Sequence, residues 1–107
     1  MTRPLVEILY FDGCPHHHAA RELVDRVIGE IGGAAEVRLV NVADEESARR
    51  ARFLGSPSIR VNGRDIEPSA DARAEYVLSC RLYRTEQGFA GQPEEAWLRD
   101  ALAEALR

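Results

Sequence analysis

The feature that most constrains the fold is a short apolar run near the start of the chain that ends abruptly in a turn. Residues 5–11 read Leu-Val-Glu-Ile-Leu-Tyr-Phe, and Asp12-Gly13 follows at once. A nearly continuous apolar run of this length is typical of a strand that is buried on both faces in the middle of a sheet. The run therefore predicts the central strand of an α/β fold.

The residues after this run predict an amphipathic helix and then a second strand. From Cys14-Pro15 onward, apolar residues recur at intervals of three and four as far as Ile31, and Gly32-Gly33 ends the pattern. Proline suits a first helical turn, and this spacing places the apolar side chains on one face of a helix. Residues 37–42, rich in valine and leucine, then predict a second buried strand.

The middle of the chain predicts a short helix followed by a β-hairpin. Asp44 is a natural N-cap for a helix that runs to Leu54 and stops at Gly55. Asn62-Gly63 separates two short runs, residues 58–61 and 64–67. An Asn-Gly pair in this setting is the strongest short-range sign of a hairpin, because both residues tolerate the left-handed backbone that the turn needs.

The C-terminal part predicts one more helix, preceded by a long segment that connects it to the hairpin. Pro93 opens the helix, and an apolar stripe from Trp97 to Leu106 forms its buried face. The order is therefore βαβαββα in a single domain over residues 1–107, with an extra segment, Pro68–Gln92, before the last helix. So long a loop seldom lacks structure, so we predict a helical turn at Tyr76–Leu78 and a short strand at Ser79–Arg84.

Composition and charge exclude several classes of function. The chain has 107 residues and a formal net charge of −4, and its basic residues form no long run, so nucleic acid is not an expected partner. The longest uncharged apolar stretch, Ile8–Phe11, is far shorter than the ~20 residues of a membrane helix, so no membrane association is expected. No secretory signal is visible, so we expect a cytoplasmic protein whose two cysteines are free thiols.

Cys14 is the first candidate for chemistry, because it lies where the predicted central strand passes into a helix. This position is expected to expose the sulfur at the carboxyl edge of the sheet and to direct the positive end of the helix dipole toward it. Both the dipole and the neighbouring His16 and His17 favour the thiolate, which is the reactive form of cysteine. The alternative is a buried cysteine that fills a small apolar gap.

With these residues the chain resembles the thioredoxin superfamily, and its small glutaredoxin-like members most closely. The motifs are Cys14-Pro15-His16-His17 after the first strand and Ser56-Pro57 before the third. The resemblance implies a thioredoxin-like βαβαββα sandwich with a cis proline at Pro57, beside the active sulfur, whose loop pairs with the backbone of a bound peptide or of glutathione. It also implies a thiol or disulfide substrate, with glutathione as a candidate co-substrate. The expected substrate-binding residues are Pro15, His16, Ser56 and Pro57.

One departure from the family concerns its second motif cysteine, which is replaced here by His17. The usual dithiol cycle within the motif cannot run. The position of Cys80 therefore decides whether Cys14 has a partner thiol. If Cys80 and Leu82 point inward from a strand, Cys80 is an ordinary core residue. If its segment instead folds over the carboxyl edge of the sheet, Cys14 and Cys80 form a pair that is either a resolving disulfide or a two-thiolate clamp for a soft metal.

Three functions remain open at this point. The first is a thiol-dependent redox protein with Cys14, His17 and Cys80 as catalytic residues. The second is a soft-metal or organomercurial handling protein, because the chain is similar to small bacterial proteins of which some are labelled alkylmercury lyase. The third is a redox-inactive interaction module. No resident cofactor or metal is expected, since consecutive helical residues such as His16, His17 and His18 point about 100° apart. Oligomeric state is not determined by the sequence.

Overall fold

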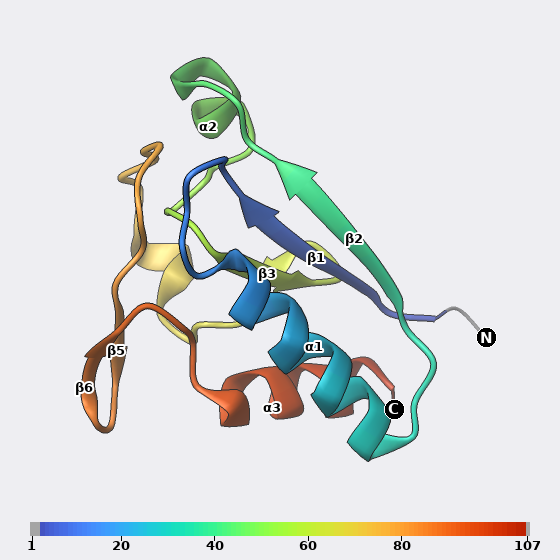
Figure 1. Ribbon diagram of the computed structural model, residues 1–107. Helices are drawn as coiled ribbons and strands as arrows, with labels where there is room; N and C mark the ends of the chain where they lie inside the picture. Colours follow the sequence, from blue (N-terminus) through green and yellow to red (C-terminus); the bar gives the residue numbers. More distant parts are fainter. Residues whose placement is uncertain (1–2, 107) are drawn as a thin grey trace.

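The computed structural model describes residues 3–106 and folds them into a four-stranded mixed sheet, three helices and an additional two-stranded hairpin (Figure 1). The predicted single domain also included residues 1, 2 and 107, which lie outside the described part. None of the described helices is both long enough and apolar enough to span a membrane. In chain order the elements are β1 (Leu5–Tyr10), α1 (His17–Ile31), β2 (Glu36–Asn41), α2 (Glu45–Arg50), β3 (Ser58–Val61), β4 (Arg64–Asp65), the 3-10 helix η1 (Ala70–Ala72), β5 (Tyr83–Thr85), β6 (Gly88–Ala90) and α3 (Glu95–Ala105).

The sheet has the order β2-β1-β3-β4, which confirms β1 as an interior strand. β1 runs parallel to β2 and antiparallel to β3, with Leu9 opposite Ser58. The predicted hairpin between β3 and β4 is confirmed, and Asn62 and Gly63 have φ values of 52° and 85°. Both residues thus take the left-handed conformation that the turn requires. β4 is shorter than predicted and ends at Asp65.

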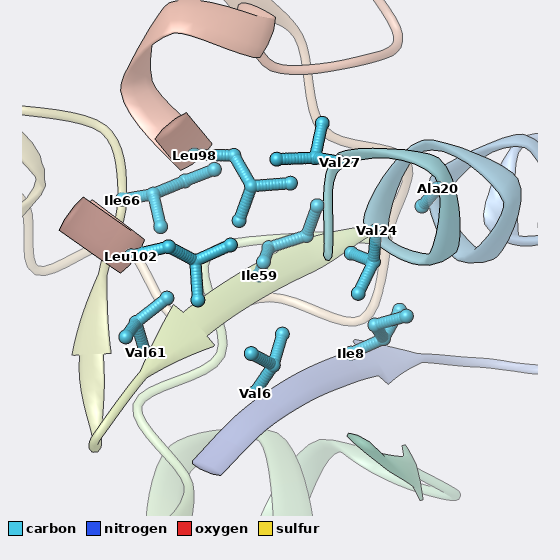
Figure 2. Close-up of a cluster of buried hydrophobic side chains, with 10 residues drawn as sticks. All are labelled: Val6, Ile8, Ala20, Val24, Val27, Ile59, Val61, Ile66, Leu98 and Leu102. Atoms are coloured by element: carbon cyan, nitrogen blue, oxygen red, sulfur yellow. The ribbon is translucent and has the colours of Figure 1, made fainter. Parts of the chain in front are cut away.

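The main core lies between the sheet and the two long helices, α1 and α3 (Figure 2). Alternate residues of β1 and β3 point to this face, as the two-residue period of a strand requires. Helix α1 meets them with residues spaced three and four apart, the predicted helical stripe. Leu9, Phe53 and the α2 residue Ala48 belong to a second, smaller cluster with Val42. The main cluster comprises Val6, Ile8, Ala20, Val24, Val27, Ile59, Val61, Ile66, Leu98 and Leu102.

Helix α2 ends earlier than the sequence predicts. Asp44 is its N-cap as expected, with the carboxylate accepting a hydrogen bond of 2.7 Å from the Ser47 amide. The helix stops at Arg50 instead of Leu54, because Arg52 turns into the left-handed region with φ 55°. The Phe53 amide then donates to the Ala48 carbonyl at 2.8 Å, and the Arg52 amide donates to the Arg49 carbonyl at 3.2 Å. These two bonds form a Schellman motif, which closes a helix and is usually built on glycine.

The long segment between β4 and α3 has structure of its own, but not the predicted elements. The predicted helical turn at Tyr76–Leu78 is wrong, because the only helical turn in residues 68–92 is η1. The predicted strand at Ser79–Arg84 is partly right. Cys80 makes an isolated β-bridge and β5 begins at Tyr83, where it pairs with the unpredicted β6.

Candidate functional site

β1 ends and β3 begins at the same end of the sheet (Figure 1). Cys14 lies shortly after β1 and Pro57 directly before β3, so both belong to this end. Ser58 is opposite Leu9 near the end of β1, so the turn that precedes Ser58 is level with the chain that leaves β1. The Ser56–Pro57 peptide bond is cis, as the resemblance implied. The two sequence motifs therefore lie at the same edge of the sheet.

Cys14 lies deeper and farther from the helix than predicted. The residue is 4% exposed, whereas the sequence led us to expect an exposed sulfur. Its amide donates to the Phe11 carbonyl at 3.2 Å, which folds the chain into a turn directly after β1. Helix α1 begins at His17 with His16 as N-cap, so Pro15 precedes the helix instead of opening it. The His16 side chain makes no capping hydrogen bond, so the first-turn amides of α1 have no side-chain cap.

The histidines after Cys14 are held by two different neighbours. The His17 ring stacks on the Tyr10 ring, with ring centroids 4.7 Å apart and an angle of 14° between the ring planes. The ring centroids of His17 and His18 are 4.0 Å apart. The His16 carbonyl accepts a hydrogen bond of 2.7 Å from Gln92 Nε2. A Cβ atom at Gly91 would lie 2.7 Å from the His16 ring, so a larger residue there would require the ring to shift. The extra segment thus packs onto the start of α1, which the sequence did not predict.

A five-residue segment, residues 77–81, lies along the cis-proline turn, and we call it the strap. The Ser56 amide donates to the Ser79 carbonyl at 2.8 Å, and the Arg81 amide donates to the Ser56 carbonyl at 2.9 Å. The Val77 amide donates to the Phe53 carbonyl at 3.1 Å. Cys80 is therefore the residue opposite Ser56 in a parallel β-bridge. Of the two alternatives for this segment, the structure shows the one in which it pairs with the turn at this end of the sheet.

The interpretation of Cys80 as a core residue is wrong. Cys80 and Leu82 are exposed, whereas Arg81 and Tyr83 are buried, at 2% and 0% exposure. The alternation is the reverse of the one that hydrophobicity predicts. Gly55, with φ +118°, makes room for the strap, since a Cβ atom there would lie 2.8 Å from Arg81 Cβ.

Arg81 is buried because a set of acceptors surrounds its guanidinium group. Asp65 accepts from both terminal nitrogens at 2.6 and 3.1 Å, and Glu67 accepts at 2.9 Å. The Ser58 hydroxyl lies 2.9 Å from Nη1, and the guanidinium carbon lies 4.3 Å from the centre of the Tyr83 ring. Burial is the largest single influence on the pKa of Arg81 and lowers it, but the hydrogen bonds to Asp65 and Glu67, together with the nearby negative charge, outweigh burial and raise the pKa. The buried charge cluster thus fixes the strap to β3 and β4.

Tyr83 links this cluster to the proline turn, because its hydroxyl donates to the Pro57 carbonyl. Burial raises the pKa of the Tyr83 phenol well above its usual value. The unfolded chain therefore loses this proton first as the pH rises, so the contribution of Tyr83 to stability is complete below about pH 10 and decreases above it.

We predict that above pH 10 the free energy of unfolding falls with a slope that approaches about 1.4 kcal/mol per pH unit by about pH 11, and that Tyr83→Phe removes this contribution. Urea unfolding at pH 9, 10 and 11 measures it. Tyr83→Phe also loses the hydrogen bond to Pro57, so it is expected to be about 1 kcal/mol less stable at neutral pH. An unchanged alkaline slope in Tyr83→Phe would contradict the assignment.

Two further observations, one at this edge and one on the described chain as a whole, bear on ligand binding. The Ser56 hydroxyl is buried and has no hydrogen-bond partner among the described residues, which is rare for a buried polar group. Within residues 3–106, no three His, Cys, Asp or Glu side chains gather closely enough to hold a metal ion.

Comparison with known proteins identifies the family. No protein-family model matches the chain. The chain is 30% identical over 82 residues to a thioredoxin of Methanocaldococcus jannaschii, a match that covers 72% of this chain and 95% of that protein. The crystal structure of a selenoprotein W-related protein from Vibrio cholerae superimposes with a TM-score of 0.56 at 17% identity, covering 99% of this chain and 100% of that chain. The structural match shows the fold, the curated relative shows the family, and the chain belongs to the thioredoxin superfamily.

Proposed function

We propose that this protein is a thiol-disulfide oxidoreductase in which Cys14 attacks a disulfide substrate and Cys80 resolves the mixed disulfide. The observation that carries the proposal is the β-bridge between Ser56 and Cys80. This bridge brings the second cysteine to the proline turn, at the end of the sheet where Cys14 lies. Both cysteines are free thiols, which is the reduced state that such a cycle starts from.

The strap supplies the second thiol that the missing motif cysteine would otherwise supply. In the family, the turn before the cis proline pairs with the backbone of a bound peptide or of glutathione. Here the amide and the carbonyl of Ser56 pair with the strap instead. Cys80 thus takes the place of a substrate residue beside the active sulfur, which supports a role as an internal resolving thiol.

The cycle balances as a two-electron exchange. The Cys14 thiolate attacks one sulfur of a substrate disulfide, the substrate S–S bond breaks, and the first thiolate leaves. The Cys80 thiolate then attacks the sulfur of Cys14, which releases the second substrate thiol and forms a Cys14–Cys80 disulfide. Two molecules of a small thiol, with glutathione as the candidate, reduce this disulfide and are oxidised to one small-molecule disulfide. The protons released by the thiols pass to solvent and return to the leaving thiolates.

Burial of Cys14 indicates the size of the substrate. Only a slender group reaches a sulfur whose residue is 4% exposed, so low-molecular-weight disulfides are favoured over those of folded proteins. The residues proposed to contact the substrate are the exposed Pro15 and His16. Ser56 and Pro57 are buried, and the Ser56 backbone already pairs with the strap, so these two residues are not proposed to contact the substrate directly. His17 is proposed to stabilise the Cys14 thiolate by its charge when protonated.

The test is formation of the internal disulfide. We expect one equivalent of oxidised glutathione to convert the reduced protein into a monomer with no free thiol, in which peptide mapping finds Cys14 linked to Cys80. In Cys80→Ser the same oxidant is expected to leave glutathione trapped on Cys14, because no resolving thiol remains. Ser79→Cys/Cys80→Ser serves as a matched control, since it moves the thiol by one strap residue.

Other outcomes replace the proposal. If no internal disulfide forms and the reduced protein instead binds one Hg²⁺ that requires both cysteines, a soft-metal clamp is the better reading. If neither oxidant nor Hg²⁺ reveals any dependence of one cysteine on the other, the two-cysteine cycle is wrong.

A further inference from the structure

An arginine-lined pocket lies beside the β3–β4 hairpin and the end of α2, and its lining includes neither Cys14, Pro57 nor any strap residue. Its volume is about 230 Å³. Part of its wall is formed by the end of α2 and the residues before the proline turn, and part by the region of η1. The charged and aromatic side chains that define it are Arg52, Arg60, Arg64, Arg73 and Tyr76.

Arg60 and Arg52 bring positive charge that no carboxylate balances. The Arg60 guanidinium donates to the carbonyls of Ala51 and Arg52 at 2.6 and 3.0 Å, which are uncharged acceptors. Among the described residues, neither Arg52 nor Arg60 has a carboxylate within 4.0 Å of its guanidinium nitrogens. Arg60 is therefore held in place without being neutralised.

The acidic residues around the pocket are already engaged. Asp65 is bound to the buried Arg81, and Glu67 is shared between Arg81 and Arg73. Asp71 lies 3.7 Å from Arg64, in a pair that is largely exposed and so contributes little. The four arginines of the pocket and the neighbouring Arg81 thus supply five guanidinium groups, whereas Asp65, Glu67 and Asp71 supply three carboxylates. This group of residues has a surplus of two positive charges in a chain whose net charge is −4.

The backbone of Arg52 provides an independent sign that its side chain has a role. Its φ of 55° closes the Schellman motif of α2, a position where glycine avoids the cost of the left-handed conformation. A charged residue there costs local stability and brings a guanidinium group to the pocket. Such a departure from the favoured residue is a reason to look for a function.

We propose that this pocket binds the phosphoryl group of a small molecule. A phosphate monoester has a charge of about −1.5 to −2 at pH 7 and three acceptor oxygens, which matches the surplus of two charges. The planar fork of arginine binds such oxygens through paired hydrogen bonds. The volume exceeds that of a phosphoryl group alone, so the rest of the ligand packs against the Tyr76 ring at the wall.

The experiment is a titration of the full chain with inorganic phosphate and then with phenyl phosphate, followed by amide chemical shifts at constant ionic strength. We expect saturable shifts confined to the ends of α2 and β3 and to the region of η1, with phenyl phosphate binding more tightly. Arg52→Gln is expected to weaken binding at least tenfold. Arg84→Gln removes the same charge from an exposed position on β5 and is expected to change the affinity less than twofold.

Three outcomes overturn the proposal. Equal weakening by Arg52→Gln and Arg84→Gln would mean that only the overall charge of the protein matters. Binding of succinate as tight as that of phenyl phosphate would show a site for dianions in general. Absence of saturable shifts in the wild-type protein would show that the pocket binds no phosphate. Circular dichroism of each variant confirms that it is folded, and because Arg52 is exposed its replacement leaves the core intact.

Discussion

Replacing Arg81 with methionine is expected to lower the free energy of unfolding by about 3–5 kcal/mol, the usual cost of removing one partner from a buried ion pair. The guanidinium group is fully buried, and Asp65 depends on it for two hydrogen bonds. Methionine has a similar length but offers Asp65 no donor. Urea unfolding at pH 7 measures the loss. Glu67 also loses its hydrogen bond from Arg81, but it remains paired through its hydrogen bond from Arg73 at 3.0 Å, so it is expected to contribute less to the loss of stability.

Two further variants separate the buried charge from other effects of this substitution. Arg84→Met makes the same chemical change at an exposed position of β5 and is expected to stay within about 0.5 kcal/mol of the wild type. Adding Asp65→Asn to Arg81→Met removes the uncompensated carboxylate and is expected to restore part of the loss. If Arg81→Met were as stable as Arg84→Met, the strap would not depend on the buried cluster.

Cys14→Ser is expected to reduce the rate of glutathione-dependent reduction of a small disulfide, such as bis(2-hydroxyethyl) disulfide, by at least about 100-fold. Serine preserves the size of the side chain, but its hydroxyl neither ionises near neutral pH nor forms a disulfide. This expectation rests on the proposed redox function. A coupled assay that follows oxidised glutathione measures the rate.

Cys80→Ser is the variant to compare with Cys14→Ser, because it removes only the proposed resolving step. Its rate is expected to fall by about tenfold, since glutathione in solution replaces Cys80 as the resolving thiol, only less efficiently. Unchanged activity in Cys14→Ser, with folding verified by its thermal transition, would exclude Cys14 as the nucleophile. If Cys80→Ser lost more activity than Cys14→Ser, the exposed cysteine would be the attacking thiol and the order of the cycle would be reversed.

The sequence by itself determined the order of the elements outside the segment between β4 and α3, and the position of the two motifs. Hydrophobic period and turn residues are local signals, and they were sufficient for the central strand β1, the long helices α1 and α3 and the hairpin at Asn62-Gly63. The family motifs also predicted the cis bond before Pro57. These features depend on residues that are close together in the chain, so no tertiary contact is needed to read them.

Only the tertiary structure decided the conformation of the strap and the burial of its side chains. Hydrophobicity predicts that Cys80 points inward and Arg81 outward, but the reverse is found. Arg81 is buried because Asp65 and Glu67, which come from the end of the β3–β4 hairpin, surround its charge. The approach of Gly91 to His16 likewise depends on a partner that is distant in the chain. A sequence pattern records the polarity of each residue but not the partner that compensates it, and here that partner decides which side chains face the site.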